Sequence, residues 1–230
     1  MKKRIVISYS GGKDSTLALN RLIRSNEWEI DSLLTTIIED SRRTSAHGVR
    51  ESLLEEQALS LGIPLRKVYI PAICSNEVYE NIMKKSIDKI VQDGVNYMMF
   101  GDIHLQDVKE YREKILINTP INAIFPIWGE DPNDLIHEFL QSGFKTVVTC
   151  IDSAKLDASF IGRVIDDSFL NELPNNVDVC GEYGEFHTFV FDGPLFKKPI
   201  DFVVSTEITV TKDKYTNEDR YYHKDLISIT

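Results

Sequence analysis

The sequence predicts an α/β protein, in which helices cover both faces of a mostly parallel sheet and a smaller α+β C-terminal domain follows. Over the first half of the chain, apolar runs of strand length alternate with segments of helical periodicity. Parallel strands that are joined through helices need right-handed crossovers, and these place helices on both faces of the sheet. From residue 126 onward strand-like runs prevail, which indicates a second, smaller domain.

The first half contains four expected strands and four expected helices. The strands are expected at residues 4–9, 30–38, 65–70 and 97–101, and the helices at residues 14–25, 49–61, 76–92 and 105–117. The helix at residues 49–61 carries its apolar side chains on one face, and Gly62 just past its end is typical of a helix terminus.

The second half is richer in strands. Residues 133–141 are expected to form a helix and residues 160–173 to be partly helical, whereas strands are expected at residues 145–151, 186–191, 202–211 and 221–229. Turn-forming residues at positions 192–194 and 216–218 separate the last three strands. We therefore predict two domains, residues 1–125 and residues 126–230.

Composition excludes several classes of protein. The chain has 230 residues and a formal net charge of −10, with 36 acidic against 26 basic residues. Such a charge disfavours a nucleic-acid partner and favours a small molecule or a protein. No apolar run approaches the ~20 residues that cross a bilayer, and the first apolar run is too short for a signal peptide. We therefore expect a cytoplasmic protein without a membrane partner.

The cysteines give no sign of a metal site or a disulfide framework. Cys74, Cys150 and Cys180 are far apart in the sequence and form no paired motif. Buried small apolar side chains are their expected role.

The first motif is a run between the first strand and the first helix, Ser10-Gly11-Gly12-Lys13-Asp14-Ser15. Adjacent glycines let backbone amides approach an anion, and the helix N-terminus adds partial positive charge. The Lys13 ammonium and the serine hydroxyls are further donors. The run is neither a Walker A sequence nor a dinucleotide fingerprint. It predicts a site for nucleotide phosphates, with Asp14 either as an Mg²⁺ ligand or as a helix cap.

Two further segments should lie at the same edge of the sheet, because ligands bind beyond the carboxyl ends of parallel strands. Gly101 and Asp102 end the fourth strand, where the carboxylate can meet ribose hydroxyls or a metal ion, or can simply form a turn. His47 and Arg50 follow the second strand, as donors to phosphate and substrate or as parts of a solvated loop. We predict that these four residues contact the nucleotide.

The second motif is the run at residues 180–188, which reads Cys-Gly-Glu-Tyr-Gly-Glu-Phe-His-Thr and precedes a strand. Gly181 and Gly184 predict a tight turn that aims Glu182 and Glu185 together. Paired carboxylates can bind an ammonium ion or Mg²⁺, or can act as a general base on an attacking amine. A purely structural turn is the alternative, although it has no need of so many ionisable groups.

Together these motifs resemble the diphthine–ammonia ligase-like branch of the PP-loop ATP pyrophosphatases. The similarity runs from Arg4 to about Pro199 and includes the glycine run, His47, Gly101-Asp102-Ile103, Pro126-Ile127-Trp128-Gly129, residues 180–188 and Gly193-Pro194. It implies a HUP or Rossmann-like domain that binds ATP at residues 1–125 and a substrate-binding domain at residues 126–230. Residues 200–230 carry no motif that we can place.

In this family ATP adenylylates a carboxylate and releases pyrophosphate, and ammonia then displaces AMP to give an amide. The resemblance implies that the chain uses ATP, Mg²⁺, ammonia and a carboxylate acceptor, which is either a small molecule or a protein side chain. The phosphates would be held by Ser10, Gly11, Gly12, Lys13, Asp14 and Ser15, with Asp14 as the metal ligand. Catalytic roles are implied for Lys13, Asp14, Glu182, Glu185 and His187, and acceptor binding for Trp128, Glu182, Tyr183, Glu185 and Thr188.

One segment departs from the family pattern. The archaeal and eukaryotic enzymes usually carry Tyr-Gln and a spaced Arg-x-Glu after the Gly-x-Ile segment, whereas residues 104–113 of this chain read HLQDVKEYRE. The chain is therefore closer to bacterial relatives, which keeps the phosphate chemistry and leaves the acceptor open. A nucleotide-binding sensor without turnover, a tRNA-modifying enzyme and a homodimeric assembly also stay open.

Overall fold

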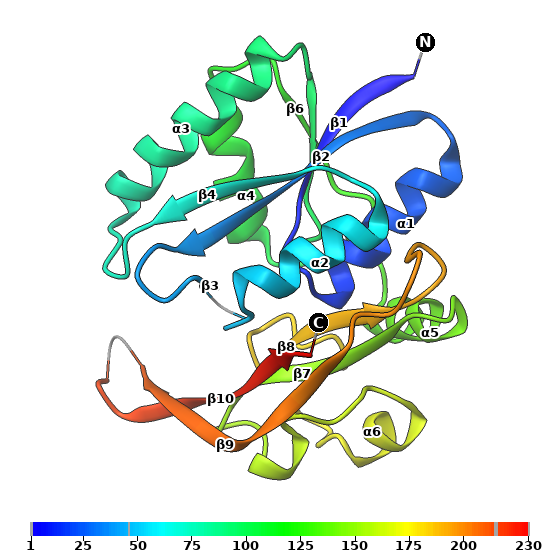
Figure 1. The fold of residues 1–230 in the computed structure, drawn as a ribbon, viewed down its shortest axis with the longest axis vertical. Coiled ribbons are helices and arrows are strands. Elements are labelled where there is room, and N and C mark those ends of the chain that lie inside the picture. Colours follow the sequence, from blue (N-terminus) through cyan, green and yellow to red (C-terminus); the bar gives the residue numbers. More distant parts are fainter. Residues whose placement is uncertain (1, 46, 214–215, 230) are drawn as a thin grey trace.

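The computed structural model of the chain describes residues 2–45, 47–213 and 216–229. Two sheets lie one above the other, and helices α1 and α2 lie between them (Figure 1). The second of these sheets is antiparallel, and it packs on the side of the first sheet where α1 and α2 lie. The predicted α/β class, with a mostly parallel sheet and a second α+β part, is confirmed.

The first sheet is built around β1. Its strands are β1 (Lys3–Ser8), β2 (Trp28–Ile38), β3 (Arg43–Thr44), β4 (Leu65–Ile70), β5 (Tyr97–Met99) and β6 (Asn122–Ile124). Strand β1 pairs in parallel with β2 on one side and with β5 on the other, β4 pairs in parallel with β2, and β6 does so with β5. The short β3 runs antiparallel to the end of β2. Neither β3, with two residues, nor β6, with three, was predicted, whereas the equally short β5 was, because residues 97–100 form an uninterrupted apolar run.

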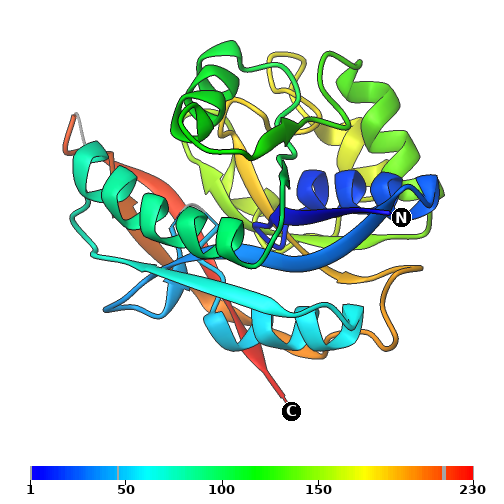
Figure 2. The ribbon, with the colours of Figure 1, turned by 90° about the horizontal axis from the view of Figure 1, so that it is seen from above.

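Helices cover both faces of this sheet, as its alternating side chains require. They are α1 (Lys13–Ser25), α2 (Glu51–Leu61), α3 (Asn76–Gln92) and α4 (Gln106–Leu116). Ile5 and Ile7 of β1 pack in one buried cluster with α1, while Val6 packs in another with Met83 and Ile87 of α3. Seen from above, α2 and α3 lie on opposite sides of the sheet (Figure 2).

The observed ends of helices α1 to α5 differ by at most two residues from the predicted ones. Val49 and Arg50 were expected in the second helix, but Arg50 has an extended backbone (φ −62°, ψ 140°) and caps α2. At its other end α2 stops at Gly62, which has a positive φ of 71°. Among the described residues, no helix is long and apolar enough to span a bilayer.

The second sheet has the strand order β8-β7-β10-β9, and all its pairings are antiparallel. Its strands are β7 (Lys145–Asp152), β8 (Phe186–Asp192), β9 (Phe202–Lys212) and β10 (Asp219–Ser228). The helices of this half are α5 (Pro132–Gln141), α6 (Asp167–Glu172) and the 3₁₀ turn Ala158–Phe160. Residues 160–173 were predicted to be partly helical, and the helical residues among them are those of α6 and the last residue of the 3₁₀ turn.

The core is continuous across the predicted domain boundary. Leu53 and Leu54 of α2 pack against Val147, Phe189 and Leu226 of the second sheet in one buried cluster. Residues of β1, α1, β7 and β8 share another cluster. Residue 126 falls between the last strand of the first sheet and α5. The division into an ATP-binding and a substrate-binding domain stays a prediction, because the two halves bury their apolar side chains together.

We expect Phe189→Ala to lower the free energy of unfolding by ~3–5 kcal/mol, because it leaves a cavity where α2 meets the second sheet. The Phe189 side chain is fully buried and its ring packs edge-on against Phe202 at 5.9 Å. Urea unfolding followed by circular dichroism measures the change. Val203→Ala, on the exposed face of β9, is the matched control with an expected effect within ~0.5 kcal/mol. Equal effects for the two variants would contradict a shared core.

Candidate active site

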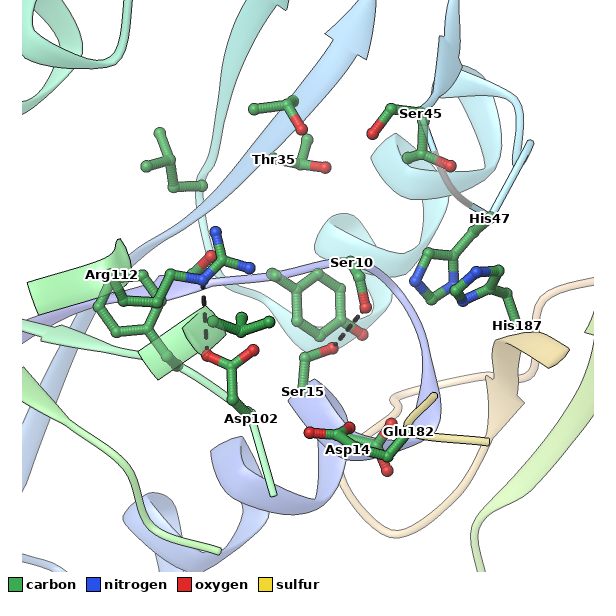
Figure 3. Close-up of a pocket in the computed structure, with 18 of the residues that line it drawn as sticks. Ser10, Asp14, Ser15, Thr35, Ser45, His47, Asp102, Arg112, Glu182 and His187 are labelled. Carbon is green, nitrogen blue, oxygen red and sulfur yellow. Dashed lines mark hydrogen bonds and ion pairs between the residues drawn. The ribbon is translucent and has the colours of Figure 1, made fainter. Parts of the chain in front are cut away.

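A cavity of about 390 Å³ lies beyond the carboxyl ends of β1, β2 and β5 (Figure 3). One end is polar, and the other lies between α3 and α4 and is mainly apolar. The polar side chains that line the cavity include Ser8, Ser10, Lys13, Asp14, Ser15, Thr35, Thr36, Thr44, Ser45, His47, Asp102, Arg112, Glu182, His187 and Thr188. The apolar end is lined by Leu34, Tyr79, Met83, Met98, Phe100, Leu105, Val108 and Ile115. The segments that the sequence placed at one edge of the sheet therefore converge.

The turn at residues 10–15, which the sequence predicts to bind phosphates and which we call the phosphate-binding turn, joins β1 to the first turn of α1 and lines the polar end. The amide of Gly12 donates to Ser10 Oγ (3.2 Å) and that of Lys13 to Thr188 Oγ1 (3.1 Å). Within the described residues, the amides of Gly11, Asp14 and Ser15 have no protein acceptor. The hydroxyls of Ser10 and Ser15 are 3.1 Å apart. Such a group of donors at the N-terminus of a helix can bind an anion.

Strand β8 holds this turn from the side of the second sheet. The amide of Val190 donates to the carbonyl oxygen of Gly11 (2.9 Å), and the fully buried Gln57 of α2 donates to the same oxygen (3.0 Å). Gln57 also donates to the carbonyl of Val190 (2.5 Å). No feature of the sequence selects Gln57, since an isolated polar residue in a helix is usually solvated.

Gly11 and Gly12 allow close packing of the turn as well as the approach of an anion to its amides. Gly11 has a positive φ of 82°, and a Cβ there would lie 2.8 Å from Gln57 Oε1. A Cβ on Gly12 would lie 2.8 Å from His47 Cε1 and 3.1 Å from the carbonyl oxygen of Thr188. Any side chain at either position would therefore push the turn away from α2 or from β8.

Lys13 is almost fully buried, and its ammonium faces protein acceptors. It lies 2.8 Å from both carboxylate oxygens of Asp14 and donates to the backbone carbonyl of Cys180. Burial lowers the pKa of Lys13, but the charge and hydrogen bond of Asp14, together with smaller contributions from Cys180 and Glu182, more than offset this, and the net shift is upward. Lys13 therefore stays charged and orients Asp14, while its predicted contact with phosphate stays a prediction.

Asp14 and Glu182 both line the cavity (Figure 3), and they are close enough for their charges to interact. Glu182 accepts hydrogen bonds from the amides of Ile103 (2.9 Å) and His104 (3.4 Å), which fixes the carboxylate between the two halves of the chain. Burial raises its pKa, and the nearby Asp14 charge acts in the same direction. Two repelling carboxylates at a phosphate site are a donor set that a cation would stabilise.

These two carboxylates suit Mg²⁺ better than they suit a metal ion whose ligands all come from the protein. The described part of the chain contains no group of three or more His, Cys, Asp or Glu side chains that could hold a metal ion. Magnesium is usually bound through one or two carboxylates together with waters and substrate phosphates. Asp14 and Glu182 supply such a pair of carboxylates.

The structure does not aim Glu185 at the cavity together with Glu182. Gly181 and Gly184 both have positive φ, at 67° and 82°, and the turn that they form directs Glu185 into the protein, where it is 3% exposed. Its carboxylate accepts from the amides of Asp178 (3.2 Å) and Tyr183 (3.0 Å). Glu185 therefore stabilises the turn, which is the alternative that the sequence left open. Tyr183 is two-thirds exposed and does not line the cavity.

Two neutral imidazoles form the wall opposite Asp102. The rings of His47 and His187 are 4.7 Å apart. His47 Nδ1 donates to the backbone carbonyl of Thr188 (2.9 Å), because a carbonyl can only accept. Burial lowers the pKa of both histidines, most strongly that of His187. Neutral imidazoles can accept a proton from a reacting group.

Asp102 lines the cavity and is paired with Arg112, a residue that the sequence analysis did not select. Arg112 Nε lies 3.5 Å from Asp102 Oδ2, and its guanidinium lies over the ring of Phe100. Burial raises the pKa of Asp102. The spacing of the cavity-lining residues of this segment, Leu105, Val108, Arg112 and Ile115, is helical and could have shown that Arg112 faces inward. Gly101 packs against α1, where a Cβ would lie 2.9 Å from the amide of Ser15.

Arg50 and Trp128 are not brought to the cavity. The guanidinium of Arg50 is bound by Asp225 of β10, and Trp128 packs edge-on against Phe125 with Lys109 over its ring at 4.5 Å. Neither residue lines the cavity. The geometry gives no support to a phosphate contact by Arg50 or to an acceptor contact by Trp128, and both stay predictions.

A glycine-rich turn between the central strand of a parallel sheet and a helix, with amides at the helix N-terminus that are free in the described part of the chain, is typical of the PP-loop ATP pyrophosphatase type. The comparisons with known proteins place the chain among the ATP-dependent ligases of this type. Models of known families identify the family within this class. The model described as the diphthamide synthase N-terminal domain matches residues 2–121, and that of the diphthamide synthase C-terminal domain matches residues 131–224. The chain belongs to the diphthamide synthase family.

Individual proteins are similar over different lengths. The diphthine–ammonia ligase of Homo sapiens is 26% identical over 234 residues, which cover 90% of this chain and 85% of that protein. A tRNA-specific 2-thiouridylase from Halorhodospira halophila is 34% identical over 92 residues, covering 36% of this chain and 22% of that protein. Among solved structures, the U34-tRNA thiolase NcsA of Methanococcus maripaludis with its [4Fe-4S] cluster gives a TM-score of 0.37 at 16% identity, covering 61% of this chain and 58% of that chain.

We expect Thr188→Val to lower the free energy of unfolding by ~1–3 kcal/mol, because the buried amide of Lys13 then loses its acceptor. Thr188→Ser keeps the hydroxyl and is the matched control. Urea unfolding of the three proteins measures the difference. Equal stabilities for the valine and serine variants would show that the bond between the turn and β8 contributes nothing.

The lowered pKa of His187 predicts a pH dependence of stability. Folding keeps this imidazole neutral, so below the ordinary histidine pKa of about 6.5 the unfolded chain binds more protons than the folded one. The stability that His187 contributes is complete above that pH and is lost as the pH falls. We expect His187→Gln to reduce the loss of unfolding free energy between about pH 7 and 5, while the exposed His137→Gln leaves it unchanged. Identical slopes for the three proteins would contradict a neutral His187.

Proposed function

We propose that the protein adenylylates a carboxylate with ATP and converts the product to an amide with ammonia, releasing pyrophosphate and AMP. The observation that carries this proposal is the convergence of the phosphate-binding turn, Glu182 and His187 on one cavity. Membership in the diphthamide synthase family supports the same chemistry. The first sheet contributes the anion site, and the second sheet contributes the groups that face the acceptor.

In the first step, an oxygen of the acceptor carboxylate attacks the α-phosphorus of ATP, and the bond between this phosphorus and the bridging oxygen to the β-phosphorus breaks. The leaving pyrophosphate carries developing negative charge. The amides of Gly11, Asp14 and Ser15 and the hydroxyls of Ser10 and Ser15 would hold it, each such donor contributing up to ~3–4 kcal/mol to the transition state. Bound Mg²⁺, held by Asp14 and Glu182, would supply further charge neutralisation.

In the second step, ammonia attacks the acyl carbon of the acyl-adenylate, and AMP leaves with the former carboxylate oxygen. The attacking nitrogen must lose a proton to give a neutral amide. His187 is a suitable acceptor for this proton, because its imidazole is neutral and lines the cavity. Ammonium, the main form of ammonia at neutral pH, would be attracted by the carboxylates of Asp14 and Glu182.

The acceptor is proposed at the level of a carboxylic acid, as a small molecule or a protein side chain. The similar human protein carries diphthine in its name, which makes this modified residue one compound to test. The helix at residues 106–116 places Arg112 where it can meet an anionic group of either kind of acceptor. Glu185, Tyr183 and Trp128 are assigned no contact with the acceptor in this proposal.

We expect Asp14→Asn to lower the formation of AMP and pyrophosphate by a factor of roughly 10²–10³, because a ligand for the phosphate-bound cation is lost. The assay combines the protein with ATP, Mg²⁺ and ammonium and with a panel of acceptors that includes diphthine and small carboxylic acids. Asp107→Asn is the matched control, because Asp107 also lies in the first turn of a helix but is exposed.

Two results would contradict the proposal. Full activity of the Asp14 variant would show that the turn takes no part in the reaction. Tight binding of ATP by the wild-type protein, with no AMP formed on any acceptor, would favour a nucleotide sensor. Lys13→Ala is a poorer test, since it leaves Asp14 without its partner and is expected to destabilise the fold.

A further inference from the structure

The segment that carries His47 forms one rim of the cavity. We call residues 43–45 and 47–50 the histidine loop. Thr44, Ser45 and His47 line the cavity, and the imidazole of His47 lies against Gly12, where a Cβ would be 2.8 Å from it. The position of this loop therefore decides the shape of the cavity at the phosphate-binding turn.

The histidine loop is held at its tip and at its base by the second sheet. At the tip, His47 donates to the backbone carbonyl of Thr188 on β8. At the base, Arg43 and Arg50 face each other in an antiparallel bridge, which brings two positive charges together. Like charges in such a pair repel, so the base needs a negative partner.

Asp225 of β10 is this partner. Its Oδ1 lies 2.8 Å from Arg43 Nη1 and 3.0 Å from Arg50 Nε, and its Oδ2 lies 2.5 Å from Arg50 Nη2. Arg43 Nη1 also donates to the carbonyl of Gly48, 2.8 Å away, so the same guanidinium links Asp225 to the far side of the loop. The Asp225 side chain is 21% exposed, which protects these charge-assisted bonds from full solvent screening.

The back of the loop fits the same strand closely. Gly48 has a positive φ of 65°, and a Cβ on it would lie 3.0 Å from Nδ1 of His223, two residues before Asp225 on β10. The imidazole of His223 therefore packs directly against the backbone of the loop at this point. Strand β10 is therefore the support on which the base of the loop rests.

We propose that Asp225 is a positioning residue that holds the histidine loop against the phosphate-binding turn and so sets the affinity of the cavity for the nucleotide. This inference rests on the proposed function, since it takes ATP as the ligand. Asp225 follows directly after the last residue that the C-terminal family model matches, and no motif of the sequence pointed to it. It touches neither the turn nor the cavity and acts through Arg43 and Arg50.

The test compares Asp225→Asn with the wild-type protein in two measurements. Calorimetric titration with ATP and Mg²⁺ is expected to show roughly tenfold weaker binding, because the ligand must then also order the loop. Hydrogen exchange of the amides of Thr44, Gly48 and Val49, which are bonded within the loop, is expected to be at least several-fold faster. Exchange in the core strand β1 should stay unchanged.

Two further variants separate positioning from general stability. Asp219→Asn changes a residue of the same strand and removes an exposed partner of Lys212. This variant should alter neither measurement. Asp225→Glu keeps the charge and should restore most of the affinity. Wild-type affinity together with wild-type exchange in Asp225→Asn would overturn the inference. Failure of the wild-type protein to bind ATP would instead contradict the proposed function, and the exchange measurement would still decide whether Asp225 holds the loop.

Discussion

The hydrogen bonds between β8 and the phosphate-binding turn are the contacts on which the candidate site depends. The amide of Lys13 donates to Thr188, and the carbonyl of Gly11 accepts from Val190 and Gln57. Buried backbone groups must find partners, and here the partners lie on the second sheet and on α2, not on the neighbouring strands of the first sheet. The conformation of the turn therefore depends on the packing of the two sheets against each other.

Among the described residues that line the cavity, no cationic side chain is left without an acidic partner to bind the phosphates. Lys13 is paired with Asp14, and Arg112 is paired with Asp102. The imidazoles of His47 and His187 are neutral because they are buried. The negative charge of a triphosphate must then be balanced by backbone amides, the α1 dipole and a bound cation. A bound cation agrees with the net negative charge of the protein, which attracts a metal ion more readily than a second anion.

Much of the fold could be predicted because its strands and helices repeat over several residues. Helix α3 has the predicted bounds, whereas β3 and β6 have too few residues to show a period. The site was harder to predict. The turn at residues 10–15 is recognisable from its glycines, but Glu185 and Arg50 are ionisable residues that bind other parts of the chain. Gln57 and Asp225 act through partners far away in the sequence, so no local pattern identified them.

The sequence by itself determined the order of the elements, the position of the anion-binding turn and the family to which its motifs point, because each of these depends on residues that are close together in the chain. Only the tertiary structure decided which ionisable side chains reach the cavity. That choice depends on contacts between segments as distant as Lys13 and Cys180, or Arg43 and Asp225. Such contacts form when two sheets bury their apolar faces together. The spacing of residues within either segment does not predict them.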